Sequence, residues 1–307
     1  MSRRWRAPTT LAVSLAATAL LILLLVGRRH EFAAAASGAA PWVLAVAVLG
    51  QVIALLARSE AWHLSIRAAG GAVERRALYR ASSMQVLGSL LSGQLGVAAR
   101  IAALRRSSGT RCPQVGTLIA AEFPILAVEA TLAGLASFTL IGPLGLPWWA
   151  PLIGLAAVTG ASTGLRRLAL RTGHALWKGL AVLRCRRGGS RVVAFVLVAV
   201  LAQVARNWLL LHAVGVDASL FDAIAVLIAV VTLGQLPVGP GLGAAAAVLI
   251  LGRNGVAAAA AAGVLMTATG TGGGMCFAAW AGADRLLSAA RTVPAAVPIP
   301  AVGGPEA

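Results

Sequence analysis

Acidic side chains are scarce in this sequence. Its 307 residues include 9 Asp and Glu against 26 Lys and Arg, and only 11% of all residues are charged, while 59% are hydrophobic. This balance excludes an ordinary soluble domain and a disordered chain. Cysteine is also rare. Cys112, Cys185 and Cys276 lie far apart, form no CxxC motif and stand beside no histidine cluster, so we expect neither a disulfide framework nor a metal site.

Patterns that indicate catalysis or nucleotide binding are missing as well. His63, His174 and His212 are isolated, and no nucleophile, base and acid can be assembled from the spacing of the residues. The chain has no Walker motif, and its TGTGGG run at residues 269–274 lies in an apolar segment without a following lysine. Such a run is typical of helix packing by small residues. We therefore expect no enzymatic activity and no cofactor.

What the chain does have is a series of apolar segments long enough to cross a membrane. They predict an all-α, polytopic transmembrane helix bundle. The expected spans are residues 9–26, 41–57, 112–141, 149–165, 192–214 and 256–281. A cleaved signal peptide is the alternative for the first of them, but the charged stretch from Arg28 to Glu31 favours a retained anchor. Residues 1–291 are thus predicted to form one transmembrane domain, with a disordered tail at 292–307.

The basic residues lie between the apolar segments, where topology and anionic lipid headgroups account for them, so nucleic acid is not an expected partner. Residues 58–80 and 166–191 are strongly basic and are predicted to be cytoplasmic. The Gly- and Ser-rich segment 81–99 is followed by a further basic stretch, so a simple crossing there would place arginines on both sides. A re-entrant hairpin removes the conflict. Both chain ends then lie on the cytoplasmic side of the cytoplasmic membrane.

A second interrupted segment is expected over residues 221–251. Its helix is broken by prolines and glycines that include Pro237, Gly239, Gly241 and Gly243. In hydrocarbon, a broken helix persists only where it is buried in protein or lines a wet cavity. The half-helix that begins at Ala244 would direct its first N–H groups into the break and favour an anion.

The two interrupted segments share an internal repeat. At an offset of 146 residues Trp62 matches Trp208 and Gly93 matches Gly239. The units, about 41–141 and 192–281, would then have opposite orientations in the membrane, as in transporters that place a binding site near the midplane. The alternative is Gly-rich packing of ordinary spanning helices.

Several of these motifs resemble the transmembrane region of lysylphosphatidylglycerol synthases and the flippase-like proteins similar to it. The resemblance covers roughly residues 43–287 and is carried by Arg58 to Trp62, Leu95-Gly96 with Arg100, Glu122, and Pro237 to Gly243. It implies a membrane protein that binds and translocates the headgroup of an anionic phospholipid. The soluble aminoacyl-transferase domain of full-length synthases is not expected here.

A non-transporting, lipid-binding scaffold that assists a cell-envelope or lipid-modifying enzyme is the alternative function. It is favoured by three positions at which the family pattern carries a charged residue: an acid after the glycine that matches Gly96, an arginine after the glutamate that matches Glu122, and a glutamate shortly after the Gly-rich break. This chain has Val97, Phe123, and Ala246 or its neighbours there. The oligomeric state stays open.

The candidate headgroup-binding residues are Arg58, Trp62, Gly96, Arg100, Glu122, Arg206, Pro237, Gly239, Gly241 and Gly243. Arg100 would bind a lipid phosphate, or extend to the interface as snorkelling arginines do. For Arg206, which lies inside a span, we expect snorkelling. Glu122 and Glu129 are seven residues apart and so share a helix face. They are expected to pair with Arg100 or Arg206, or to carry protons.

Overall fold

The computed structural model describes residues 30, 33, 34, 37–89, 93–108, 113–171, 175–233, 242–252 and 255–291. Throughout these ranges the ordered elements are helices, and the predicted all-α membrane fold is confirmed. Among the described residues, four helical stretches are long and apolar enough to cross a membrane: Pro41–Ala68, Val115–Leu144, Arg187–Ala213 and Val256–Leu287. The predicted first span at 9–26, the tail at 292–307 and the break at 237–241 lie outside the described residues.

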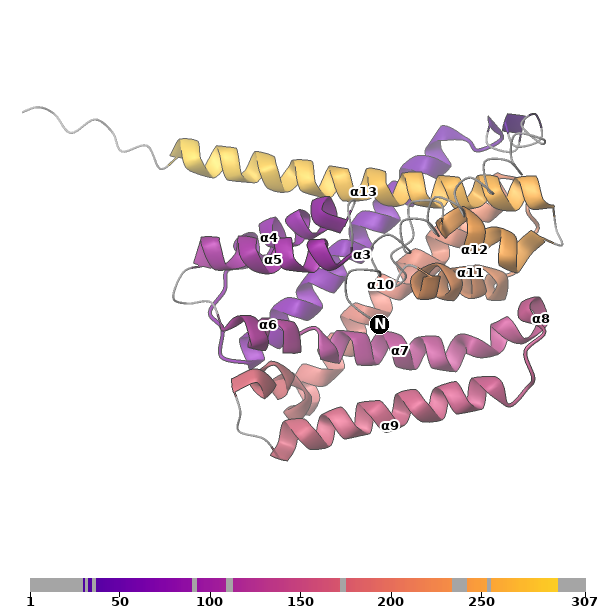
Figure 1. Cartoon of the computed structure of the whole chain (residues 1–307). Helices are drawn as coiled ribbons and strands as arrows, with labels where there is room; N and C mark the ends of the chain where they lie inside the picture. The colour runs from indigo at the N-terminus through magenta and orange to yellow at the C-terminus, as the bar shows by residue number, and fades with distance from the viewer. Residues whose placement is uncertain are drawn as a thin grey trace, which may run out of the picture.

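The helices follow one another in the order α3 (Pro41–Ala68), α4 (Arg75–Ser89), α5 (Gly93–Ser108), α6 (Val115–Ala120), α7 (Phe123–Ala136), η2 (Ser137–Leu140), α8 (Ile141–Leu144), α9 (Ala150–Arg171), η3 (Ala175–Arg184), α10 (Arg186–Ala213), α11 (Leu220–Leu233), α12 (Leu242–Leu251) and α13 (Val256–Arg291). Pro41 stands in the first turn of α3, where its missing N–H would have no partner in any case. The helix α3 packs along α10, and α13 extends past both pairs of short helices (Figure 1).

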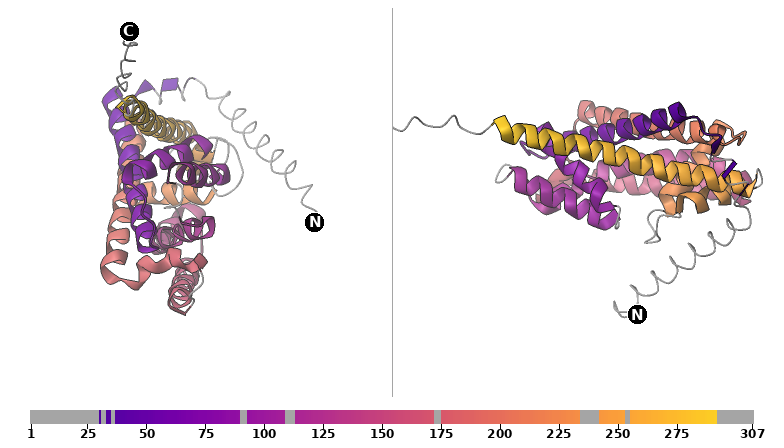
Figure 2. Two further views of the ribbon diagram at one scale, coloured as in Figure 1. Left: turned by 90° about the vertical axis from the view of Figure 1, so that its left-hand side faces the viewer. Right: turned by 90° about the horizontal axis from the view of Figure 1, so that it is seen from above.

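The two pairs of short helices, α4 with α5 and α11 with α12, pack against opposite ends of α13 (Figures 1 and 2). Two glycines let α4 and α5 approach closely. A Cβ atom on Gly96 would lie 2.7 Å from the carbonyl oxygen of Gln85, and one on Gly88 would lie 2.9 Å from the Cα of Gly96. Helix pairs therefore stand where interrupted segments were expected, and their relation as an inverted repeat remains a prediction.

The expected span at 112–141 is helical but not continuous. It is divided at Ala121 and Glu122, between α6 and α7. Pro124, which lacks an N–H group, follows immediately and cannot continue the hydrogen-bond ladder of α6. Gly179 of η3 packs directly on this break, since a Cβ atom there would lie 2.6 Å from the Thr117 carbonyl oxygen. The basic stretch 166–191 is mostly helical, because α9, η3 and α10 cover most of it.

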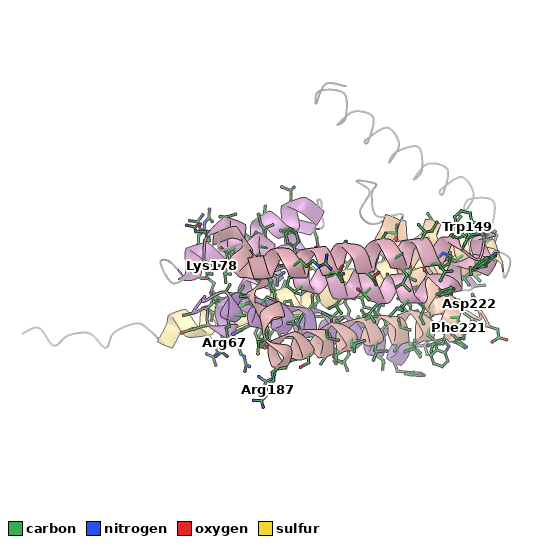
Figure 3. All side chains as sticks on the ribbon, turned by 90° about the horizontal axis from the view of Figure 1, so that it is seen from below. Arg67, Trp149, Lys178, Arg187, Phe221 and Asp222 are labelled. Carbon is green, nitrogen blue, oxygen red and sulfur yellow. The ribbon has the colours of Figure 1, made fainter. Side chains whose placement is uncertain are left out.

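The basic residues gather at one end of the bundle, as the charge pattern predicted. Figure 3 shows Arg67, Lys178 and Arg187 at the end that carries α4 and α5. Trp149 and Asp222 lie at the opposite end. The bundle therefore has a charge polarity between its two ends, which is what the positive-inside rule leads one to expect of a membrane protein.

Candidate functional site: a cationic cavity between α3, α4 and α5

Arg100 is the centre of the site. Its side chain is 2% exposed, and its Cζ atom lies 3.5 Å from the centre of the Trp62 ring. Its Nη1 atom lies 2.5 Å from Oε1 of Glu122, at the break between α6 and α7. Trp62 is itself fully buried and donates through Nε1 to the Leu118 carbonyl oxygen at 3.4 Å. Arg100 is therefore held inside the protein, and the snorkelling alternative was wrong.

A second ion pair lies beside the first. Arg58 of α3 pairs with Glu129 of α7, and the two side chains are 35% and 24% exposed. Glu122 and Glu129 thus each hold one arginine. The sequence offered Arg100 and Arg206 as partners for these carboxylates, and the structure gives Arg100 and Arg58 instead.

The two arginines line a cavity of about 100 Å³ between α3, α4 and α5. Most of the side chains around it are polar. The lining residues are Leu55, Arg58, Ser59, Ser82, Gln85, Val86, Ser89 and Arg100. Within the described part of the chain, two buried polar atoms of this lining, Oγ of Ser82 and Nε of Arg100, have no hydrogen-bond partner. Because buried polar groups are nearly always hydrogen-bonded, these two atoms mark a place where a polar ligand would be stabilised.

The cavity brings together donors that suit an oxyanion. A guanidinium group donates through a planar fork that matches phosphate and carboxylate, and serine hydroxyls and the amide of a glutamine add neutral donors. Sequence analysis missed the polar residues of α4. Ser82, Gln85 and Ser89 have spacings of three and four residues and so lie on one helix face, a signal that could have been read from the sequence.

Polar contacts hold α4 against its neighbours. Arg80 forms an ion pair with Asp284 of α13, with 2.8 Å between Nη2 and Oδ2. Tyr79, outside the four spanning helices, donates its hydroxyl to Glu60 of α3 and lies edge-on to Trp280, with 6.0 Å between ring centres. Burial, and then the hydrogen bond to Glu60, raise the pKa of Tyr79 to about 12, so it remains a donor at neutral pH.

The other candidate residues that the structure describes do not line the cavity. Gly96 allows the backbones of α5 and α4 to pack closely, because it has no Cβ atom. Arg206 lies on α10 and hydrogen-bonds to Gln51, apart from the cavity lining. Gly243 lies at the start of α12 in the other helix pair, and the candidate positions 237, 239 and 241 are outside the described residues. The structure therefore unites Arg58, Trp62, Arg100 and Glu122 in one site.

A comparison with protein families matches residues 11–278 to the model described as "Lysylphosphatidylglycerol synthase TM region". The chain belongs to this family. All cavity residues of this lysylphosphatidylglycerol synthase TM region protein lie inside the matched segment, and the family resemblance seen in the sequence is confirmed. Neither the curated proteins nor the solved structures that were compared contain a match to the chain. Within the described ranges, no group of three His, Cys, Asp or Glu side chains is placed to hold a metal ion.

Proposed function

We propose that this integral membrane protein binds the headgroup of an anionic phospholipid in the cavity between α3, α4 and α5 and moves the lipid between leaflets. The supporting observation is the lining of that cavity, with Arg58, Arg100 and four neutral polar side chains. A volume of about 100 Å³ admits a phosphate-sized group and is well below the size of pockets that enclose whole ligands. The acyl chains would therefore stay in the bilayer while the headgroup enters the protein.

Arg100 suits this role because its ion pair with Glu122 leaves one N–H group of the guanidinium available to a ligand. Glu122 accepts from Nη1, whereas Nε is buried and has no partner among the described residues. A phosphate oxygen at Nε would also come within reach of the cavity serines. Binding would then add a ligand to an existing ion pair, so Arg100 need not give up Glu122.

The proposal includes a location and a driving force. The cavity lies toward the basic end of the bundle, which we assign to the cytoplasmic side of the cytoplasmic membrane, with both termini there. Lipid mass action or an ion gradient would drive the movement. We propose no chemical step and no cofactor.

The test is lipid movement in proteoliposomes that contain fluorescent phosphatidylglycerol or, in parallel, fluorescent phosphatidylcholine. Ser82→Ala removes one cavity hydroxyl with little change in volume. Hydrogen bonds to charged groups contribute about 1.5–3 kcal/mol, so we expect phosphatidylglycerol binding to weaken about 10- to 100-fold. Phosphatidylcholine should move more slowly than phosphatidylglycerol in the unmodified protein.

The matched control is Ser190→Ala, because Ser190 is an exposed serine near the start of α10. It should leave binding and movement unchanged. Equal movement of both lipids, or a folded Ser82→Ala protein that binds and moves phosphatidylglycerol like the unmodified protein, would refute the proposed site.

A second function is favoured by one observation. Both cavity arginines have carboxylate partners, so the cluster of Arg58, Arg100, Glu122 and Glu129 is electrically balanced without a ligand. A lipid-binding scaffold that assists a cell-envelope or lipid-modifying enzyme would need only to hold a headgroup. It predicts phosphatidylglycerol binding without movement between leaflets, together with co-purification of the enzyme.

A further inference from the structure

Arg206 is a cation inside a membrane span. It lies on α10, in the span Arg187–Ala213. Its guanidinium donates to the side-chain oxygen of Gln51 on α3 and, at 3.3 Å, to Oδ1 of Asn207. Its Nε atom is buried and has no hydrogen-bond partner among the described residues. All of its partners in the structure are therefore neutral amides.

The acidic residues that the structure describes are accounted for elsewhere. Glu60, Glu122, Glu129 and Asp284 form ion pairs with other arginines. Asp222 accepts a hydrogen bond from the Ser219 hydroxyl at 2.7 Å at the start of α11. Glu74 and Asp217 are exposed, and the remaining two acids, at positions 31 and 306, are outside the described residues. Arg206 thus has no carboxylate partner in the part of the chain that the structure describes.

The guanidinium of Arg206 is directed into the bundle. A Cβ atom on Gly270 of α13 would lie 3.4 Å from its Nη1 atom, and one on Gly50 of α3 would lie 3.6 Å from its Cβ atom. Glycines on two neighbouring helices therefore leave room for the side chain between α3, α10 and α13. This position is opposite to the snorkelling expected from the sequence, and an inward cation without a counter-charge favours an anion at the same place.

The position of Arg206 continues the arginine-lined cavity along α3. Its partner Gln51 lies seven residues before Arg58, which is two helical turns on nearly the same face, or about 10 Å along the helix axis. Leu55, between these two residues, lines the cavity. A headgroup that leaves the cavity along this face of α3 would meet Arg206 next.

We propose that Arg206, together with Gln51 and Asn207, is a second binding site for the same anionic headgroup, about 10 Å along the axis of α3 from Arg58. This inference depends on the proposed function. The first site binds the lipid through hydrogen bonds from its guanidinium and hydroxyl groups to the headgroup phosphate. The second site lowers the barrier for moving that charge through the middle of the bundle, so it affects the rate of movement and leaves the first binding step unchanged.

The test is Gln51→Glu, which places a carboxylate beside Arg206 with almost no change in volume. The new carboxylate would pair with Arg206 and occupy the anion's position. We expect a protein at least as resistant to unfolding as the unmodified one, with phosphatidylglycerol movement reduced at least tenfold. Its affinity for phosphatidylglycerol in detergent should stay within about twofold, because the cavity keeps all of its lining residues.

Matched variants separate this effect from a general change of charge. Gln114→Glu adds a carboxylate at an exposed position before α6 and should leave lipid movement unchanged. Arg206→Lys keeps the charge and should retain more movement than Arg206→Gln. If Gln51→Glu does not fold, Gly270→Val tests the same site, because its side chain crowds the guanidinium and should slow lipid movement without weakening binding.

The outcomes distinguish the two proposals. If the unmodified protein neither binds nor moves fluorescent phosphatidylglycerol, the proposed function itself is wrong. If it moves the lipid and the folded Gln51→Glu or Gly270→Val protein does so at the same rate, only the second site is refuted. A parallel measurement of inorganic phosphate uptake shows whether the bound anion is a lipid headgroup or free phosphate. Uptake of phosphate that depends on Arg206, without lipid movement, would overturn the lipid assignment.

Discussion

Replacing Glu122 with glutamine would leave the buried guanidinium of Arg100 without its carboxylate. Glu122 and Arg100 are 13% and 2% exposed, so bulk solvent has little access to the unpaired guanidinium. Removing one member of a buried ion pair destabilises a protein by about 3–5 kcal/mol. The Trp62 ring remains 3.5 Å from the cation and retains part of its stabilisation, so we expect the lower end, about 3 kcal/mol.

The double variant Arg100→Met with Glu122→Gln shows whether this loss comes from the unpaired charge. Removing both charges leaves no buried ion, so the double variant should be less destabilised than the sum of the single variants by about 2 kcal/mol. The measurement is the free energy of unfolding from reversible titration with sodium dodecyl sulfate in mixed micelles, followed by far-ultraviolet circular dichroism.

The control is the pair of Arg75 and Glu60, whose nitrogen and oxygen lie 3.4 Å apart. Its arginine is 66% exposed, and its glutamate, 14% exposed, keeps the hydrogen bond from Tyr79. Arg75→Gln should change the free energy of unfolding by less than about 1 kcal/mol, because water screens the pair. If Glu122→Gln is equally mild, or if the two single variants are additive, the ion pair with Arg100 does not support the fold as described.

Three further measurements test the surroundings of the site. Arg80→Ala removes the ion pair between α4 and Asp284 of α13 and should reduce the free energy of unfolding by about 1.5–3 kcal/mol. An unchanged free energy of unfolding would show that this ion pair does not stabilise the fold. Gly96→Ala should destabilise by about 1–3 kcal/mol because its Cβ would meet the α4 backbone, whereas Gly282→Ala, with open space around it, should stabilise slightly. Backbone N–H groups at the start of α10 lower the pKa of Cys185. At pH 8, a variant in which Cys185 is the single cysteine should therefore react with iodoacetamide faster than a cysteine in an unstructured peptide. An equal rate would contradict the prediction.

The amino-acid sequence alone was enough for the fold class, the family and the charge polarity of the bundle. These properties depend on local composition: an apolar segment must form a helix in hydrocarbon, and arginines between such segments select one side of the membrane. The basic stretches on both sides of residues 81–99, and the prolines and glycines within 221–251, likewise led us to expect interrupted segments there. The sequence did not reveal the break at Glu122, since Pro124 is compatible with a kinked but continuous helix.

Only the tertiary structure decided which charges meet. The sequence placed Arg58, Arg100 and Arg206 near membrane segments, but helix periodicity says nothing about which helices become neighbours. The fold pairs Arg58 and Arg100, which line the cavity, with Glu129 and Glu122, and it leaves Arg206 with amide partners. The physical reason is that the free energy of a cation in a membrane protein depends on its partner and its burial. Both are set by helices distant in the sequence.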